Sequence, residues 1–510
     1  MGSLLGSLRR GCVVVSLFGC VGVGSAVAAT QDPFVEALHK RLNFVFKNDK
    51  RGRENLGVSV FSLSRQETLF ELNAESPLMP ASTVKLLTAV VALRKLGPDY
   101  TYKTMVYADK APKNGVLEGN LYLKGGGDPS LVTERLFLLA ADVLRTGIKE
   151  VRGDIVVDDW IFDQIGHDPR RIPTETDRPY NAPVGGLSFN YNSTTVYFRP
   201  GERLGDPARV FVEPDTGYVR IKNDAKTSKA GSAYKIDAVR ASSDESGDTI
   251  RVTGSIPLGM TEQRRYFNIV SPSSYSGYAM KMLLEMRGVR FAQSSKIVHK
   301  EVPHTAIKIT ELGSLPLSEI VKLMNKYSNN FIADTILKTL GKELRGSPGT
   351  MDKGLEVLNE EALRLGLDTK GLNLVSGSGL TRINRMSTRQ FIQLINASYL
   401  DFEVLPELLS SLPIAGRDGT LRSRMHGTQA FGRLRGKTGS IDGVAAIAGV
   451  VQSRGGELLA FSVMMNDASK DNSVIRNWQD PLGQALAEFS RKNPLSEKPS
   501  PSGPTIRGKR

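Results

Sequence analysis

The sequence predicts a protein of mixed α/β (α+β) class, in which two helix-rich segments flank a long strand-rich insertion. A strongly apolar helical pattern follows residue 80. Short alternating runs separated by Gly, Pro, Asp and Asn turns then fill residues 99–265, and helical patterns return after Pro272. The chain has 510 residues, 40% of them hydrophobic and 24% charged, which is enough for two or three folded domains.

The N-terminus is typical of a secretory signal peptide. Two arginines precede an apolar stretch over residues 13–23, and small residues fill positions 25–29. We expect residues 1–28 to be removed and the protein to be exported across the inner membrane to the periplasm. The alternatives are a membrane anchor and a lipoprotein cleavage site at Cys20, but the apolar stretch is shorter than the ~20 residues that a spanning helix needs.

The cysteines and the net charge limit which bonds, metal sites and binding partners the mature protein can have. Cys12 and Cys20 both lie in this leader, so the mature protein is expected to have no disulfide and no cysteine-bound metal. The formal charge of +14 could indicate nucleic acid binding, but export favours an anionic envelope polymer or peripheral association with a membrane surface. Simple solubility explains the charge equally well. Residues 493–510, rich in Pro, Ser and Lys, predict a disordered tail.

The predicted elements follow from hydrophobic periodicity. A helix is expected from about residue 32, then a β-hairpin at 57–63 and 67–71, then a buried helix that starts near Ser82 and stops at Gly97. Beyond the insertion the patterns predict helices at 278–286, 317–324, 329–340, 354–365 and 388–400, and strands at 445–451 and 458–465.

These elements suggest three structural units. We expect a main domain formed by residues 30–98 and 270–490, an inserted domain formed by 99–197 and 256–269, and a more polar, strand-rich subdomain nested within it at 198–255.

Ser82 and Lys85 are the first candidates for chemistry. They lie three residues apart at the start of the buried helix, so both side chains share one face and the amine can take the hydroxyl proton. This spacing also occurs by chance, as in Ser232 and Lys235, but that pair lies in a polar, turn-rich segment. A helix that is held rigidly by its apolar residues is the better support for a nucleophile.

Two further motifs follow in order. Ser328 and Asn330 could present a hydroxyl and an amide to a substrate from one short segment, although both residue types also commonly cap helices. Lys437, Thr438 and Gly439 precede an apolar strand, as expected for an edge strand along which a peptide can bind, although a surface lysine before a hairpin looks the same.

The order S-x-x-K, S-x-N, K-T-G is the signature of penicillin-recognising serine enzymes. The sequence contains no G-x-S-x-G, no H-E-x-x-H and no P-loop, and its five histidines are widely scattered, which argues against a Ser-His-Asp hydrolase and a zinc peptidase. We therefore expect a serine enzyme that needs no metal and no cofactor.

With these motifs the chain resembles the class C low-molecular-mass penicillin-binding proteins, the D-alanyl-D-alanine carboxypeptidase/endopeptidase family. Residues 125–130, 376–382 and 418–421 also match that family. The resemblance implies a β-lactamase/transpeptidase-like domain, a sheet flanked by helices, interrupted by an insertion that forms two extra domains. Tyr327-Ser328-Asn329 also fits the Y-x-N element of class C β-lactamases, but residues 331–335 resemble the carboxypeptidase helix, so we assign Ser328 and Asn330 to the motif.

The resemblance also implies the roles of the residues. Ser82 would form the acyl-enzyme, and Lys85, kept neutral by Lys437 and by partial desolvation, would act as its base. Ser328 would relay a proton to the leaving amine, and Asn330 would hold the substrate amide.

Further residues are expected to bind the substrate. Lys437 and Thr438 of the K-T-G element, which Gly439 completes, would hold the terminal carboxylate, and the backbone N–H groups of Ser82 and Ser440 would form the oxyanion hole. Arg382 matches the position that contacts a diaminopimelate carboxylate in relatives, and we choose Asp177 as the partner of the ammonium group.

The predicted function is a serine D-alanyl-D-alanine carboxypeptidase or DD-endopeptidase that acts on peptidoglycan stem peptides and is inhibited by penicillin and other β-lactam antibiotics. A β-lactamase would need an efficient water activator, and no E-x-x-x-N element stands out. A catalytically silent envelope-binding protein would lack Ser82, Lys85 or Lys437, and all three are present. The balance between the two peptidase activities, the diamino acid of the substrate and homo-oligomerisation remain open at this stage.

Overall fold

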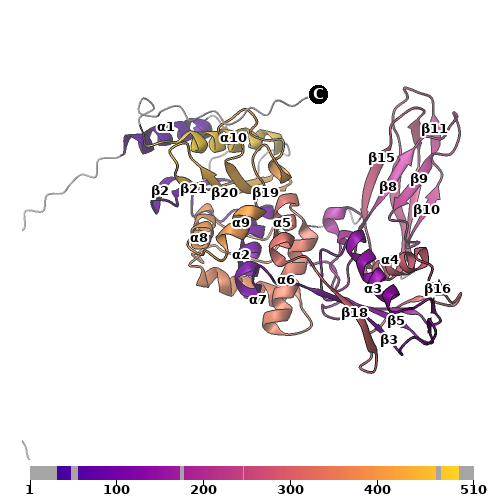
Figure 1. Ribbon diagram of the computed structural model, residues 1–510. Helices are drawn as coiled ribbons and strands as arrows, with labels where there is room; N and C mark the ends of the chain where they lie inside the picture. The colour runs from indigo at the N-terminus through magenta and orange to yellow at the C-terminus, as the bar shows by residue number, and fades with distance from the viewer. Residues whose placement is uncertain (1–31, 48–54, 173–176, 245, 467–471, 493–510) are drawn as a thin grey trace, which may run out of the picture.

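The computed structural model describes residues 32–47, 55–172, 177–244, 246–466 and 472–492. The expected leader and the expected C-terminal tail lie outside the described residues. Figure 1 shows three parts, which we call the main lobe (residues 32–98 and 317–492), the inserted region (103–192 and 272–313) and the nested sheets (193–268).

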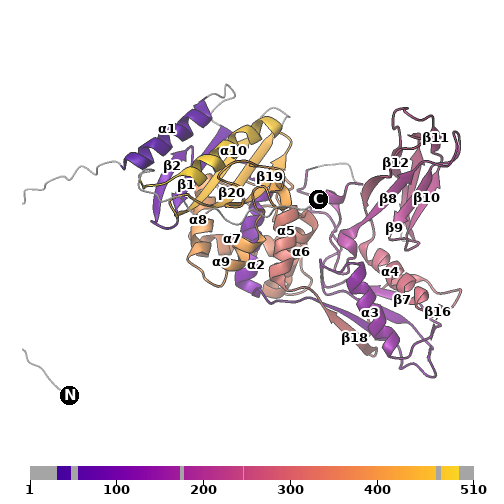
Figure 2. The same cartoon turned by 45° about the horizontal axis from the view of Figure 1, so that its top comes forward.

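A five-stranded antiparallel sheet forms the centre of the main lobe. Its spatial order is β19 (Leu434–Ile441), β20 (Val444–Gln452), β21 (Leu458–Asn466), β1 (Leu56–Ser62) and β2 (Glu67–Leu72). The helices α1 (Pro33–Lys47) and α10 (Asn472–Glu488) cover one face, and a layer of helices covers the other (Figures 1 and 2). Because both faces are covered, β20 is buried over nearly its whole length. β19, which carries the K-T-G element, is an edge strand, as predicted.

The helical layer is built around one buried helix. Lys85 to Leu93 of α2 (Lys85–Leu96) are all buried, as expected for a helix that neighbours surround on every side. It ends at Gly97, whose φ of 84° suits glycine. The surrounding elements are η2 (Ala81–Val84), α5 (Leu317–Tyr327), α6 (Asn330–Arg345), α7 (Met351–Arg364), α8 (Thr388–Tyr399) and α9 (Leu405–Ser411).

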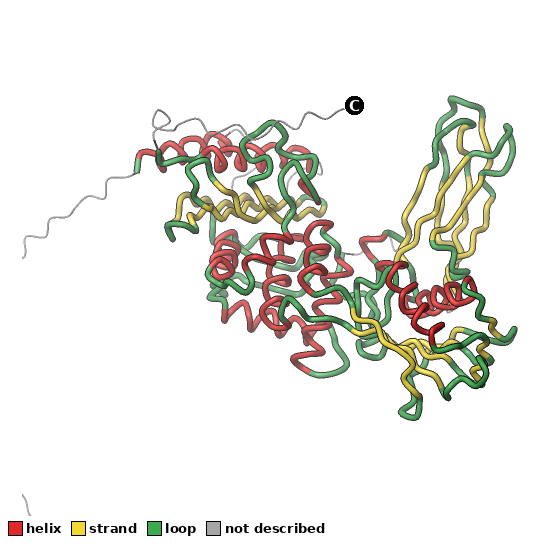
Figure 3. The backbone as a smooth tube through the Cα atoms, in the orientation of Figure 1, coloured by secondary structure: helices red, strands yellow, loops and turns green. Residues whose placement is uncertain are grey.

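The inserted region leaves the main lobe after α2 and has its own sheet and core. Its five-stranded sheet runs β17 (Ile297–His299), β7 (Ile155–Asp158), β5 (Leu121–Lys124), β3 (Lys103–Ala108) and β18 (Ile307–Gly313). A smaller sheet contains β16 (Arg290–Phe291), β6 (Glu150–Val151) and β4 (Val116–Leu117). Helices α3 (Thr133–Arg145) and α4 (Pro272–Met286) pack together beside these strands (Figure 3). Along the chain, the short helices η3 (Pro179–Asn181) and η4 (Asn190–Asn192) follow β7 and precede the nested sheets.

The nested sheets project away from the main lobe (Figure 1). One sheet contains β15 (Gln263–Asn268), β8 (Ser193–Arg199) and β9 (Arg209–Glu213), and a second contains β10 (Val219–Asn223), β13 (Gly247–Thr253) and β12 (Asp237–Asp244). A short pair, β11 (Lys226–Ser228) and β14 (Ser255–Pro257), completes this part. Alternate residues of β9 are exposed, so this strand covers a thin core on one side only.

Two expected boundaries are wrong. We expected the main domain to resume at residue 270, but α4 packs on the inserted sheet, and β17 and β18 are edge strands of that sheet. The apolar side chains of Tyr275 and Leu284 lie in the inserted core, because helical periodicity reveals an apolar face but not its partner. Residues 256–269 were expected in the inserted domain, whereas β14 and β15 belong to the nested sheets.

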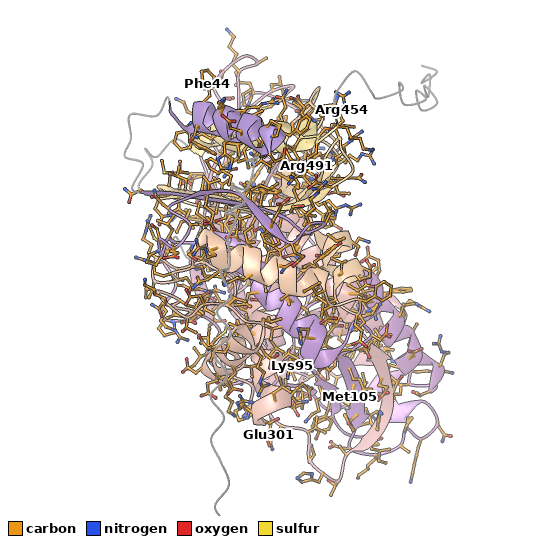
Figure 4. The ribbon with its side chains drawn as sticks, turned by 90° about the vertical axis from the view of Figure 1, so that its left-hand side faces the viewer. Phe44, Lys95, Met105, Glu301, Arg454 and Arg491 are labelled. Atoms are coloured by element: carbon orange, nitrogen blue, oxygen red, sulfur yellow. The ribbon has the colours of Figure 1, made fainter. Side chains whose placement is uncertain are left out.

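The two ends of the described main lobe meet. Arg491, labelled in Figure 4, forms ion pairs with Asp32, Glu67 and Glu457, which join the segment after α10 to the start of α1 and to β2. Within the ranges that the structure describes, no helix is long and apolar enough to cross a bilayer.

Candidate active site

A cavity of about 340 Å³ lies where the helical layer, the edge strand β19 and the inserted region meet. It brings together side chains that are far apart in the sequence. Its lining includes Ser82, Tyr180, Ser328, Asn330, Arg382 and Ser440. Lys85 and Lys437 are fully buried beneath this lining, and their amines donate hydrogen bonds to the hydroxyl groups of Ser82 and Ser328, respectively.

Ser82 and Lys85 meet because the chain forms a short 3₁₀-helix before α2. In a 3₁₀-helix, residues three apart lie on the same side, and η2 carries Ser82 while Lys85 opens α2. The Lys85 Nζ atom lies 2.9 Å from Ser82 Oγ. The predicted pair is therefore in hydrogen-bonding distance, whereas Ser232 and Lys235 are exposed in the nested part.

The Lys85 amine has three acceptors. Besides Ser82 Oγ it donates to Asn330 Oδ1 at 2.7 Å and to the backbone oxygen of Ser378. Its side chain is fully buried, so its position is fixed by these contacts and by the helix that carries it. Ser378 lies in the 376–382 block, in which only Arg382 had a predicted role.

Ser328 and Asn330 reach the site from the junction between α5 and α6. Ser328 ends α5 in a left-handed conformation with φ of 55°, and Asn330 is the first residue of α6. Asn329 points elsewhere, because its side chain caps α6 by accepting from the Ile332 N–H, and Tyr327 is 72% exposed. The geometry thus places the S-x-N pair, rather than the Y-x-N pair, in the cavity.

Lys437 and Thr438 extend from β19 toward two different partners. Lys437 Nζ donates to Ser328 Oγ at 2.8 Å. The Thr438 hydroxyl donates to Thr420 Oγ1 at 2.7 Å. Thr420 belongs to the 418–421 block, and its neighbour Asp418 accepts from Lys326 Nζ at 2.7 Å. This block therefore connects the segment before Ser328 to the edge strand.

Two glycines allow the backbones to approach one another at the nucleophile. A Cβ atom on Gly439 would lie 2.6 Å from the Pro80 oxygen and 3.1 Å from the Ser82 nitrogen. A Cβ atom on Gly379, whose φ is 79°, would lie 2.0 Å from the Ala81 oxygen. Larger residues at these positions would push β19 or the 376–382 block away from Ser82.

Burial changes the proton affinity of both lysines. It lowers the pKa of Lys85 to about 7, an effect that the Asp334 carboxylate opposes and the Arg171 guanidinium reinforces. Burial and the charge of Lys85 lower the pKa of Lys437 well below its usual range. We expected partial desolvation and Lys437 to act on Lys85; burial is instead complete, and Arg171 is the cation that adds to it.

The remaining predicted residues separate into two groups. Arg382 and Ser440 line the cavity, and Arg382 Nη2 donates to the Asp442 oxygen at 2.8 Å. Asp177 is not in the lining, and its carboxylate is 3.2 Å from Arg265 Nη2 of β15. The structure therefore does not bring Asp177 to the site. Tyr180, which no motif marked, also lines the cavity. Arg171, likewise unmarked, and Asp334, noted only as part of the 331–335 resemblance, act on the charge of the nearby Lys85.

Known proteins match this chain over most of its length. The model of the D-Ala-D-Ala carboxypeptidase 3 (S13) family matches residues 38–489. The chain belongs to this family. It is 32% identical over 503 residues to a D-alanyl-D-alanine carboxypeptidase from an Actinomadura species, a match that covers 95% of this chain and 91% of the relative. It is also 25% identical over 448 residues to the D-alanyl-D-alanine carboxypeptidase DacB of Haemophilus influenzae, covering 84% and 89%.

A solved structure from the same group of proteins has a similar fold. The crystal structure of penicillin binding protein 4 (dacB) from Haemophilus influenzae matches with a TM-score of 0.73 and 22% identity, covering 89% of this chain and 99% of that one. The predicted resemblance to the D-alanyl-D-alanine carboxypeptidases and the predicted multidomain α/β fold are thereby confirmed. As a member of the S13 family, the protein is a serine peptidase.

Proposed function

We propose that this S13 peptidase cleaves D-alanyl-D-alanine bonds of peptidoglycan stem peptides through an acyl-enzyme on Ser82. The observation that carries the proposal is the contact of Lys85 with Ser82 at 2.9 Å, made by a fully buried amine whose pKa is lowered to about 7. An amine that is partly neutral at physiological pH and touches the hydroxyl is a suitable general base.

The reaction begins with proton transfer. Ser82 Oγ gives its proton to Lys85 Nζ and forms a bond to the carbonyl carbon of the penultimate D-alanine, whose oxygen takes the negative charge. The backbone N–H groups of Ser82 and Ser440 stabilise that oxyanion, and loss of one such donor typically costs about 3 kcal/mol. The C–N bond then breaks, the leaving amine takes a proton, and an ester remains on Ser82.

Ser328 is the residue that we propose to supply this proton. Its hydroxyl accepts from Lys437 Nζ at 2.8 Å, so it can pass a proton toward the leaving amine while Lys437 replaces it. Asn330 would hold the substrate amide with the amide hydrogen that Tyr180 does not engage. Once Lys85 and Lys437 have exchanged protons with solvent and recovered their starting charges, water attacks the ester while Lys85 takes one of its protons. The C–O bond breaks, Lys85 returns that proton to Ser82, and the stem peptide leaves as a free carboxylate whose proton goes to solvent.

The substrate carboxylate supports the charge states that this scheme needs. Burial lowers the pKa values of both lysines, and the charge of Lys85 adds to this effect at Lys437. The state in which both lysines are protonated is therefore unfavourable near neutral pH. A terminal carboxylate bound by Lys437 and Thr438 favours the proton on Lys437. That charge in turn favours the neutral form of Lys85, so binding prepares the base.

Arg382 is proposed to select the substrate side chain. It is exposed at the cavity and can bind a free carboxylate, such as that of a diaminopimelate residue in the stem peptide, by two parallel hydrogen bonds. Asp177 is left out of this role because Arg265 engages its carboxylate.

The proposed substrate also indicates where the enzyme acts and which compounds inhibit it. Peptidoglycan lies outside the cytoplasm, and residues 13–29 have the pattern of an export signal, so we propose a periplasmic enzyme. Penicillin and other β-lactams carry a carboxylate and a strained amide, and we propose that they acylate Ser82. A structure of the Haemophilus influenzae relative is complexed with a β-lactam, which supports this proposal.

The test is hydrolysis of defined substrates. Purified protein is incubated with a stem pentapeptide that ends in D-alanyl-D-alanine and with a cross-linked muropeptide dimer, and the products are identified by mass spectrometry. Release of D-alanine, or conversion of the dimer to monomers, is expected for the natural protein and for Ser232→Ala, but not for Ser82→Ala. Equal activity of Ser82→Ala would contradict the proposal. The ratio of the two products measures which peptidase activity dominates.

A further inference from the structure

Two opposite charges are buried beside the site and play no part in the reaction described above. Arg171 of the inserted region and Asp334 of α6 form an ion pair, and their side chains are 5% and 3% exposed. Arg171 Nη1 also donates to Asn181 Oδ1 at 3.0 Å. A buried ion pair contributes little to stability by itself, so its presence next to reacting groups calls for another explanation.

Hydrogen bonds connect this pair to Lys85. Asn181 ends η3, and the preceding residue, Tyr180, accepts from Asn330 Nδ2 with its backbone oxygen at 3.0 Å. The other end of the same amide, Asn330 Oδ1, accepts from Lys85 Nζ at 2.7 Å. The carbonyl on one side and the amine on the other allow only one orientation of this amide. Arg171 thus holds the segment that orients Asn330 toward Lys85.

The pair also balances charge next to Lys85. Asp334 lies one turn after Asn330 on α6, so the two side chains share a face of the helix. The other charged groups around this cluster are Lys437 on β19, Lys338 on α6, which binds Asp163, and the titratable His167, which contacts the Asn181 oxygen. If either member of the pair were lost, an uncompensated charge would remain in a poorly solvated place.

We propose that the Arg171–Asp334 pair is a positioning element through which the inserted region orients Asn330 and keeps the net charge beside Lys85 close to zero. Neither side chain belongs to the described lining of the cavity. The proposal rests on the role of Lys85 as base in the proposed function, and it assigns the inserted region a part in catalysis besides shaping the cavity.

The pH profile of acylation distinguishes this role from a structural one. The second-order rate of acylation by a fluorescent penicillin is measured from pH 5 to 9 for the natural protein, Arg171→Met, Asp334→Asn and the double variant. Without Arg171 the remaining carboxylate favours charged Lys85, so the acidic limb of the profile moves up by about one pH unit and the rate at pH 7 falls about fivefold. Without Asp334 the limb moves down. The double variant is expected to return to within about half a unit of the natural profile.

Two further variants separate charge from packing. Arg171→Lys keeps the positive charge, so its acidic limb is expected to stay in place even though the contact with Asn181 is weakened. Arg424→Met removes an equally buried arginine of the main lobe, 8% exposed, which pairs with Asp480 away from the cavity. It is expected to lower thermal stability without moving the limb. If a single variant fails to fold, Arg171→Lys and the double variant, in which no charge is left unpaired, still test the proposal.

Direct measurement of the Lys85 titration midpoint distinguishes a failure of the positioning proposal from a failure of the proposed function. In protein labelled with ¹³Cε-lysine, the Lys85 resonance is identified by its loss in Lys85→Arg, and its titration midpoint is followed in each variant. Midpoints that move in opposite directions in Arg171→Met and Asp334→Asn support the proposal even if penicillin does not acylate the protein, which would count against the proposed function alone. Midpoints that stay unchanged, or that move in the same direction, overturn the proposal.

Discussion

The main lobe and the inserted region contribute to the same cavity by different means. The main lobe supplies each side chain proposed to react, on elements fixed by two large apolar cores. The inserted region supplies a backbone oxygen from Tyr180 and the buried charge of Arg171. From these contacts we infer that a region with no reacting group can still influence reactivity, through the orientation and the electrostatic surroundings of groups that belong to its neighbour.

The largest effect is expected from the main lobe. Lys85→Met removes the base and leaves Ser82 without a proton acceptor, so the rate of acylation should fall about 10³-fold. Stopped-flow or discontinuous measurement with a fluorescent penicillin gives this rate. Lys235→Met, at the exposed chance match of the same spacing, serves as the control and should acylate normally. A Lys85→Met rate within tenfold of the natural one would exclude Lys85 as the base.

The pH dependence of the natural protein should show the same base. Lys85 can take the proton only when neutral, and its pKa is lowered to about 7, so the rate is reduced wherever pH lies below that value. Between pH 6 and 5 the acylation rate should decrease about tenfold per unit, and above pH 8 it should level off. A rate that continues to rise to pH 10 would indicate a lysine with an ordinary pKa.

A smaller effect is expected where the main lobe supports its own edge strand. Thr420→Val removes the acceptor of the Thr438 hydroxyl at 2.7 Å, which costs about 1 kcal/mol or about fivefold in kcat/KM for a peptide with a terminal carboxylate. The loss should appear mainly in KM. Thr420→Ser, which keeps the hydroxyl, should restore most of the activity, and failure to do so would point to packing instead.

The smallest effect is expected in the nested sheets. Arg251 and Asp224 form an ion pair with side chains 58% and 55% exposed. Arg251→Met should change the free energy of unfolding by less than about 1 kcal/mol and should leave acylation within about twofold, because exposed pairs are well solvated and distant sites act independently. Chemical denaturation and the acylation assay test this directly. A larger kinetic effect would show that the nested sheets also influence the cavity.

Sequence reasoning found the groups that we propose to react more readily than it found their surroundings. Ser82 and Lys85 could be predicted because their interaction is set by three residues of local chain, and Ser328, Asn330 and Lys437 by short motifs of fixed order. Arg171 and Asp334 are 163 residues apart, and nothing in either local pattern shows that they meet. Asp177 was chosen for its charge alone, and Arg265 proves to be its partner.

The same limit applies to the fold. The periodicity predicted most helices of the main lobe and the strand pair β20 and β21 close to their observed bounds. It also predicted a helix within α4, but assigned it to the wrong domain, because an amphipathic pattern does not tell which sheet the apolar face will contact.

The central claim is that Ser82 forms the acyl-enzyme, and intact mass spectrometry after incubation with benzylpenicillin tests it most directly. The natural protein and Ser232→Ala are expected to gain the mass of one penicilloyl group, which peptide mapping should place on Ser82, while Ser82→Ala gains nothing. An adduct on another residue, or an equal adduct on Ser82→Ala, would contradict the account. Rapid turnover of the antibiotic with no persistent adduct would instead indicate a β-lactamase.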